Sequence, residues 1–148
     1  MKRLTSGNVG GYLERLSRIS AEDRPAFGSL TPAGLMAHLR RTFEISLGEH
    51  ETPLIPAPMP RAWLRWMVLA PIPWPRGKIK APADFTPDPE GLDAERARLE
   101  EAAQRFVAFA EANPGERRPS PLAGPMTMRQ WQRLHYRHLK HHLSQYGV

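Results

Sequence analysis

Apolar residues recur every three or four positions in four stretches of the chain, which predicts four amphipathic helices. The first stretch follows Asn8, a residue type that can cap a helix, and its apolar positions extend to Ile19, before a stop at 23–25. The second begins with Thr31 as its cap and Pro32 at the first helical position, where proline loses no hydrogen bond. Gly48 ends this second helix.

The third and fourth stretches show the same spacing. The third begins near Asp88 or Asp93 and ends at Asn113, which a proline and a glycine follow. The fourth follows Thr127, whose hydroxyl can accept a hydrogen bond from the N–H of Gln130. Because the Gln130 side chain can reach back to the cap, this start has the form of a capping box, and the helix is expected to span 127–146.

Proline sets the character of the segment from residue 51 to residue 88, which holds more than half of the 16 prolines. Proline interrupts helices, so we expect an extended, ordered crossover between the second and third long helices. One short helix can form between Pro60 and Ala70, with Trp63, Trp66 and Met67 facing inward. No stretch alternates long enough to predict a strand, and residues 117–125 are interpreted as a turn.

These elements predict an all-α fold, a four-helix bundle in one domain that spans residues 1–148. The chain has no cysteine, which excludes disulfides, thiolate metal sites and a nucleophilic cysteine. The N-terminus lacks the apolar core of a signal peptide, and the most apolar run, 62–74, is too short to span a bilayer. We therefore expect a cytoplasmic protein with no membrane partner.

The last helix has two faces of different chemistry. One face, expected to be exposed to solvent, is a basic row of Arg129, Arg133, Arg137 and Lys140. On the apolar side, His138 and His142 are four residues apart, so their rings can point at one common atom. A divalent metal ion would give both buried rings a partner. The alternative is a histidine-rich helix that is partly solvated, and the pair lacks the glutamate of the metalloprotease H-E-x-x-H motif.

His38 lies on the predicted second helix, on a mostly apolar face. A single histidine in such a place is either a core residue with a hydrogen-bond partner or a third ligand. Metal sites in helical bundles are built from side chains on facing helices. The packing of the helices decides between the two interpretations, and periodicity does not determine that packing.

Three segments resemble a known family: Leu30–Leu39 (LTPAGLMAHL), Met126–Trp131 (MTMRQW) and His138–Gly147 (HLKHHLSQYG). They are similar to the DinB-like (DinB/YfiT-like) superfamily of proposed metalloenzymes, and most similar to the branch called DUF1569. The resemblance covers both ends of the chain and leaves the proline-rich middle poorly covered. It implies that His38, His138 and His142 bind one divalent metal ion, with zinc or nickel expected. It also implies that His141 is not a ligand and that Gln145 belongs to the recurrent pattern.

The resemblance implies a metal-dependent enzyme that activates a water or a thiol, because three histidines leave a coordination position open. A thiol-dependent transferase or a hydrolase would act on a small-molecule substrate, with a low-molecular-weight thiol as partner. No residue matches a general base of that superfamily, so the catalytic residues stay unassigned.

Two other functions remain open from the sequence. One is a non-enzymatic bundle whose histidines are structural or bind metal without turnover. The other is a basic module, with a net charge of +6, that binds an anionic partner through the basic row. We do not expect nucleic acid as that partner. Arginine greatly outnumbers lysine, and alanine and proline are abundant, a pattern that also follows from a GC-rich genome without any functional meaning. A homodimer is a further open alternative.

Overall fold

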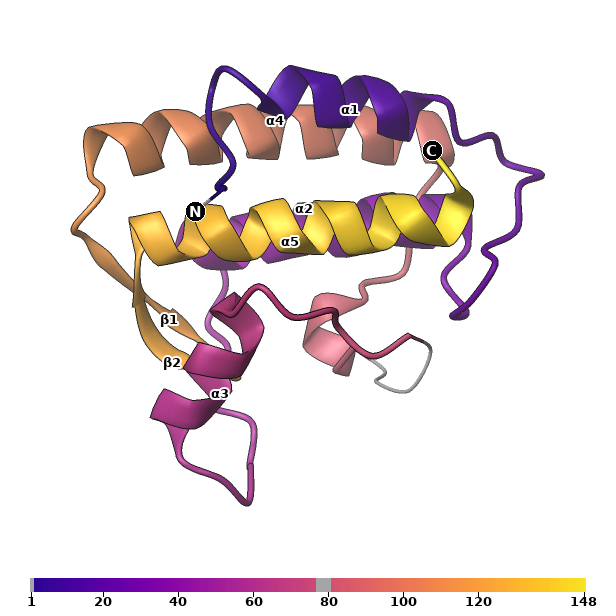
Figure 1. Ribbon diagram of the computed structural model, residues 1–148. Coiled ribbons are helices and arrows are strands. Elements are labelled where there is room, and N and C mark those ends of the chain that lie inside the picture. Colours follow the sequence, from indigo (N-terminus) through magenta and orange to yellow (C-terminus); the bar gives the residue numbers. More distant parts are fainter. Residues whose placement is uncertain (1, 77–80) are drawn as a thin grey trace.

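The structure, a computed structural model, describes residues 2–76 and 81–148 (Figure 1). In this part of the chain there are five α-helices, one short 3₁₀ helix and one two-stranded sheet. The helices are α1 (Val9–Ser17), α2 (Pro32–Ser46), α3 (Arg61–Leu69), α4 (Leu92–Ala112) and α5 (Met128–Tyr146), with η1 at Ala83–Phe85. The strands are β1 (Arg117–Ser120) and β2 (Gly124–Thr127).

Four of the helices, α1, α2, α4 and α5, pack around one core, so the predicted mostly helical bundle is confirmed in outline (Figure 1). Helices α2 and α4 share the largest contact, and α5 contacts both of them. The largest side chains of this core are Phe43 from α2, Phe106 from α4 and Trp131 from α5, each almost fully buried. No helix within the described residues is long and apolar enough to cross a membrane.

The N-terminal caps predicted for α2 and α5 are both present in the structure. The hydroxyl of Thr31 accepts a hydrogen bond from the N–H of Gly34 at 3.1 Å. Thr127 and Gln130 form the complete capping box, at 2.9 and 3.2 Å. Asn8 behaves differently, because its side-chain oxygen accepts from the N–H of Thr5 at 2.8 Å instead of capping α1. This cap interpretation was wrong, although α1 begins at the expected residue.

A β-hairpin replaces the turn that we expected at residues 117–125. Strands β1 and β2 are antiparallel, and Arg117 faces Thr127 in the register. Pro119 faces Pro125 in the middle of the hairpin, and neither has an N–H to donate. Proline is usually evidence against a strand, so the sequence pattern hid this element. The hairpin is attached to the start of α5, since Trp131 Nε1 donates to the carbonyl oxygen of Arg118 at 3.2 Å.

The predicted short helix exists as α3, but its orientation differs from our expectation. Trp63 and Trp66 are 44% and 59% exposed, so the prediction that they face inward was wrong. Leu64 and Leu69 are the buried residues of this helix instead. Among the described helices and strands, α3 mainly contacts α5 and β2, and a helix covered on one side has room for few inward positions. Within the described residues, the crossover on either side of α3 is irregular and holds η1, so it is not extended throughout; residues 77–80 of it lie outside the described part.

A buried ionic network joins α2 to α4. Arg40 Nε donates to a carboxylate oxygen of Glu95 at 2.8 Å, and a second nitrogen of the same guanidinium donates to Glu44 at 2.8 Å. The Glu95 side chain is completely buried. Because a buried carboxylate without a partner is costly, Arg40 and Glu95 fix how these two helices face each other.

We predict that Glu95→Ala destabilises the protein by about 3 kcal/mol, because it leaves the mostly buried Arg40 with only one of its two carboxylates. Urea unfolding followed by circular dichroism measures the change. Glu101→Ala, at an exposed position of the same helix, is the control and should change stability by less than about 0.5 kcal/mol. Equal losses in the two variants would contradict a structural role for the network.

Candidate metal centre

Three histidines from two helices meet in the interior, at the contact between α2 and α5. His38 Nε2 lies 2.9 Å from His138 Nε2, and His142 Nε2 also lies 2.9 Å from His138 Nε2. The ligand atoms of the trio all lie within 4.8 Å of one another. All three side chains are buried. Among the described residues, this trio is the one group of three such side chains that could hold a metal ion.

Two carbonyl oxygens fix the protonation of two of these rings. His38 Nδ1 lies 2.7 Å from the main-chain oxygen of Phe85, and His142 Nδ1 lies 2.6 Å from Gln145 Oε1. A carbonyl oxygen only accepts hydrogen bonds, so each Nδ1 must carry the proton and donate. In the neutral rings, the Nε2 lone pairs of His38 and His142 therefore point toward His138. This is the arrangement that metal-binding histidines usually have.

His138 lacks such a partner, because its Nδ1 is buried and makes no hydrogen bond. If Nδ1 carries the proton, three lone pairs converge and repel one another. If Nε2 carries it, this nitrogen can donate to one neighbouring ring, but the lone pair on Nδ1 is left buried without a donor. Both states leave a polar atom unsatisfied, which is costly in a dry interior. A cation placed against the three Nε2 atoms removes the repulsion, so the donor set fits a divalent metal ion.

Burial keeps these rings neutral. Desolvation lowers the pKa of His38, and it lowers the pKa of His142 to about 3. The pKa of His138 is well below its ordinary value, first because of desolvation and then because of repulsion by a charge on His142 or His38. Only a neutral imidazole has a lone pair to give to a metal. Near neutral pH all three rings are therefore in the form that binds a cation.

A surface loop supports the Gln145 amide. The N–H of Ala26 donates to the main-chain oxygen of Gln145 at 2.7 Å. Gly28, two residues later, has a φ of +83°, and a Cβ built on it would lie 2.7 Å from Gln145 Nε2. Only glycine combines this backbone conformation with enough space. The loop between α1 and α2 thus holds the side chain that orients His142.

The other two histidines of α5 lie outside the trio. His135 is buried one turn before His138, where its Nε2 lies 2.9 Å from Ser46 Oγ and its ring stacks on Phe43. Since Ser46 donates its own proton to the Phe43 carbonyl at 2.7 Å, its oxygen accepts from the N–H of His135. His141 is half-buried beside the aromatic rings of Phe27 and Trp74.

The sequence matches the family described as "Protein of unknown function (DUF1569)" over residues 4–147. The chain belongs to this family. No curated protein matches it, and no solved structure does. Membership in the DUF1569 family, which the sequence resemblance indicated, is confirmed by this match.

In this DUF1569 protein the basic row of α5 is only partly a solvent-exposed face. Arg129 is exposed as expected, whereas Arg133 is half-buried. Arg137 is also half-buried, and its guanidinium donates hydrogen bonds to the carbonyl oxygens of Met67, Val68 and Ile72. Our expectation of exposure was therefore wrong for Arg133 and Arg137, while Lys140 is exposed as expected. A helix end exposes carbonyl oxygens and favours a cation, so Arg137 is drawn to the C-terminal end of α3.

Trp74 and Phe85, both from the crossover, are the residues of the site that the sequence did not reveal. The ring of Trp74 lies 5.9 Å from that of His138, and the Arg137 guanidinium lies 5.0 Å from the Trp74 ring centre. Phe85 takes part through its main-chain oxygen, which carries no residue-specific signal in a sequence. A crossover interpreted only as a connection therefore supplies one wall of the site.

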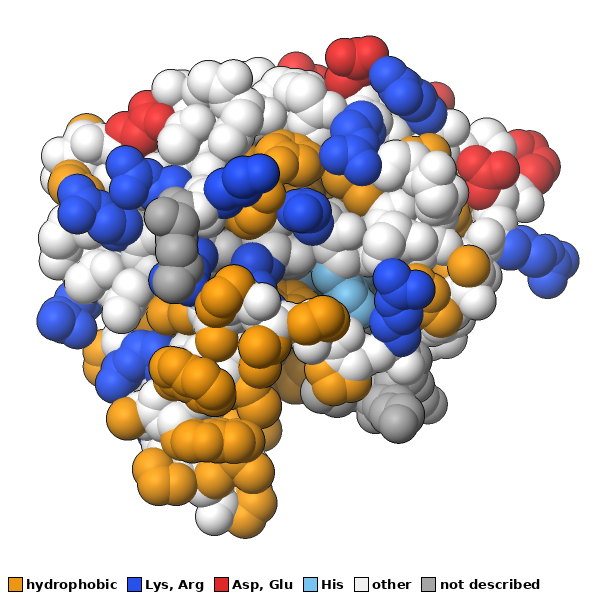
Figure 2. Space-filling view, viewed as in Figure 1, with side chains coloured by type: hydrophobic (Ala, Val, Ile, Leu, Met, Phe, Trp, Pro, Cys, Tyr) orange, Lys and Arg blue, Asp and Glu red, His pale blue; other side chains and the backbone are white. Residues whose placement is uncertain are grey.

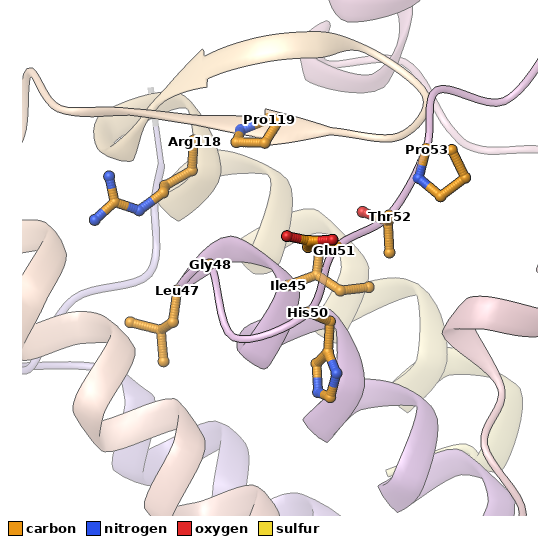
Figure 3. A pocket seen from close by; sticks show the side chains of 9 residues that line it. All are labelled: Ile45, Leu47, Gly48, His50, Glu51, Thr52, Pro53, Arg118 and Pro119. Atoms are coloured by element: carbon orange, nitrogen blue, oxygen red, sulfur yellow. The ribbon is translucent and has the colours of Figure 1, made fainter.

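An open hollow elsewhere on the molecule is separate from the histidines. It lies at the C-terminal end of α2, beside β1, where Leu47, Gly48, His50 and Arg118 line it (Figure 3). His50 contacts Glu44 at 2.6 Å. None of the three clustered histidines borders this hollow. The candidate metal centre is thus a closed cluster in the α2–α5 contact, not the floor of the open hollow.

We predict that the metal-free protein loses stability as the pH falls below about 6.5, and that His135 contributes one proton to this loss. Burial lowers the pKa of His135 to about 3 in the folded state, whereas an unfolded histidine titrates near 6.5. The unfolded chain therefore binds more protons between these values, and stability falls by about 1.4 kcal/mol per pH unit for this group. Urea unfolding between pH 7 and 5 with a chelator measures the slope.

The variant His135→Gln serves as the comparison, because glutamine can still donate to Ser46 but does not titrate. Its stability should fall less steeply with decreasing pH than that of the wild type. The difference between the two slopes should correspond to the uptake of about one proton. The other buried histidines are present in both proteins and cancel in the difference. Parallel slopes would show that His135 is not held neutral by burial.

Proposed function

We propose that this protein is a metal-dependent enzyme whose divalent ion is held by His38, His138 and His142. The observation that carries this proposal is the convergence of three buried Nε2 atoms, at 2.9 Å from ring to ring. Two of the rings are turned inward by carbonyl acceptors, from Phe85 and Gln145. A core that used these histidines only for packing would gain nothing from directing their lone pairs at one another.

Zinc and nickel are the ions that we propose, since imidazole suits both. Three protein ligands leave a position open, and a bound ion lowers the pKa of a water or thiol there. Other groups of this protein orient the histidine rings and exclude water from them. Phe85 and Gln145 hold two rings, while Trp74 and the core side chains limit water at the third.

The proposed substrate is a small molecule, with a low-molecular-weight thiol as the co-substrate. This part of the proposal rests on the resemblance to the DinB-like superfamily, which includes thiol-dependent transferases. A hydrolase fits the same site. The described residues place no carboxylate within hydrogen-bond distance of the three rings, so we assign no general base.

A structural, non-enzymatic role is the second candidate, because the three rings are at most 8% exposed. Such a site holds an ion but gives a substrate little access. The third candidate, an anionic-partner module on α5, loses support from Arg137, whose guanidinium is bound to carbonyl oxygens of the same chain.

We predict that replacing any one of His38, His138 or His142 by alanine weakens metal binding by at least about 100-fold, more than an outer-sphere change typically does. Elemental analysis of the purified variants, followed by calorimetric titration with zinc and nickel, measures this. His141→Ala and His135→Gln are the controls and should bind almost as tightly as the wild type. Similar small losses in all five variants, or stoichiometric binding by His38→Ala, would refute the site.

We also predict that the bound ion accepts an added thiol, which separates the enzyme from the structural alternative. Protein loaded with cobalt in place of zinc should develop a new near-ultraviolet charge-transfer band when 2-mercaptoethanol is titrated in. The band should be absent from cobalt-free protein and from the His142→Ala variant. A cobalt spectrum that thiols leave unchanged would favour a closed, structural site.

A further inference from the structure

The exposed apolar surface of this protein is confined to one segment. Within the described residues, the large hydrophobic side chains that are clearly exposed are Leu54, Met59, Trp63, Trp66 and Ile72. All five belong to residues 52–76, named here the α3 arm. Isolated exposed apolar residues are ordinary, but a contiguous group of them marks a contact surface. Figure 2 shows this group as one orange knob below the bundle.

Helix α3 is apolar on both of its sides. Leu64 and Leu69 face the bundle and are buried, while Trp63 and Trp66 face away from it. Apart from Arg61 and Arg65, the side chains of α3 are apolar, and apolar sides of a helix are normally covered. The outer side of α3, with Trp63 and Trp66, is therefore an exposed apolar surface that would normally be buried by a partner.

The charge of the α3 arm indicates which class of partner can bind to it. Residues 52–76 contain no aspartate or glutamate but three arginines, at positions 61, 65 and 76. Arg61 and Arg65 are half-buried and donate to main-chain carbonyl oxygens of Leu122 and Pro125, so they add positive charge to the arm, while Arg76 is exposed and can contact a partner directly. On the face drawn in Figure 2, the acidic side chains lie at the upper and right-hand edges, far from the knob, and the nearest charged side chains, above and beside it, are basic. An anionic partner complements this surface.

We propose that the α3 arm docks on an anionic lipid surface, with Trp63 and Trp66 at the level of the lipid headgroups. Tryptophan is enriched at membrane interfaces, and helices that lie in the interface combine tryptophan and leucine with basic residues. The knob projects from the molecule (Figure 2). A second copy of the chain would bring the same positive charges against it, so the knob suits an anionic lipid surface better than a homodimer.

This docking goes beyond the metal centre and does not depend on it. It also departs from our expectation of no membrane partner, which rested on the lack of a spanning segment. Attachment to one leaflet needs no such segment. The arm is attached to α5, because Arg137 donates hydrogen bonds to carbonyl oxygens at the end of α3.

Vesicle co-sedimentation tests the proposal. Full-length protein should sediment with vesicles of phosphatidylcholine and phosphatidylglycerol (7:3) at 0.1 M salt, and much less with pure phosphatidylcholine. Binding should weaken as salt is raised. The double variant Trp63→Ser/Trp66→Ser should bind about tenfold or more weakly while keeping the wild-type circular dichroism spectrum, since both side chains face outward. The single variant Trp66→Gln should give an intermediate loss.

Two charge variants distinguish an effect of the α3 arm on vesicle binding from an effect of the net charge. Arg76 lies in the α3 arm, whereas Arg98 lies on the exposed side of α4. The variants Arg76→Glu and Arg98→Glu change the net charge equally. Only Arg76→Glu should weaken binding severalfold. No binding to anionic vesicles, undiminished binding by the double tryptophan variant, or equal losses in the two charge variants would overturn the proposal. So would a concentration-dependent dimer in light scattering that the tryptophan variant abolishes, because the arm would then be covered by a second copy.

Discussion

Removal of water from three imidazole rings constrains the whole contact between α2 and α5. Each ring carries one N–H and one lone pair, and a dry interior must provide for both. The N–H of His38 donates to the Phe85 carbonyl oxygen, which comes from outside the two helices, whereas the N–H of His142 donates to the Gln145 amide oxygen, which belongs to α5 itself. The crossover must therefore return to α2 at Phe85 to satisfy the His38 ring. The path of this otherwise irregular segment thus follows from the needs of one buried ring, while the loop between α1 and α2 packs on the residue that serves the other.

The sequence was informative where local chemistry decides the structure. Caps at Thr31 and Thr127 determine where α2 and α5 begin, and glycine ends α2. The spacing of His138 and His142 placed both on one side of α5 before any packing was known. That His38 meets them is a property of how α2 crosses α5, and the sequence pointed to it only through resemblance to a family.

Other features could not be predicted, because they depend on atoms that sequence patterns do not encode. The Phe85 carbonyl is common to every residue type, so no pattern could have identified it. Arg137 had the spacing of a solvated basic row, yet the free carbonyl oxygens at the end of α3 attract its guanidinium. The hairpin was hidden by Pro119 and Pro125, which face each other where neither could have donated a ladder hydrogen bond. For Phe85 and Arg137 a contact between segments distant in the sequence decided the structure, whereas the hairpin is a local element that its prolines concealed.

The bond between Ser46 and His135 has a consequence for the alignment of the bundle along its axis. It lies in the same α2–α5 contact as the histidine trio but uses none of its atoms. If α5 slid by one turn along α2, the buried N–H of His135 would lose its acceptor, at a cost of about 1–3 kcal/mol. The two helices are thus held in register by a polar contact that lies outside the three-nitrogen cluster. Their alignment therefore does not depend on what the cluster binds.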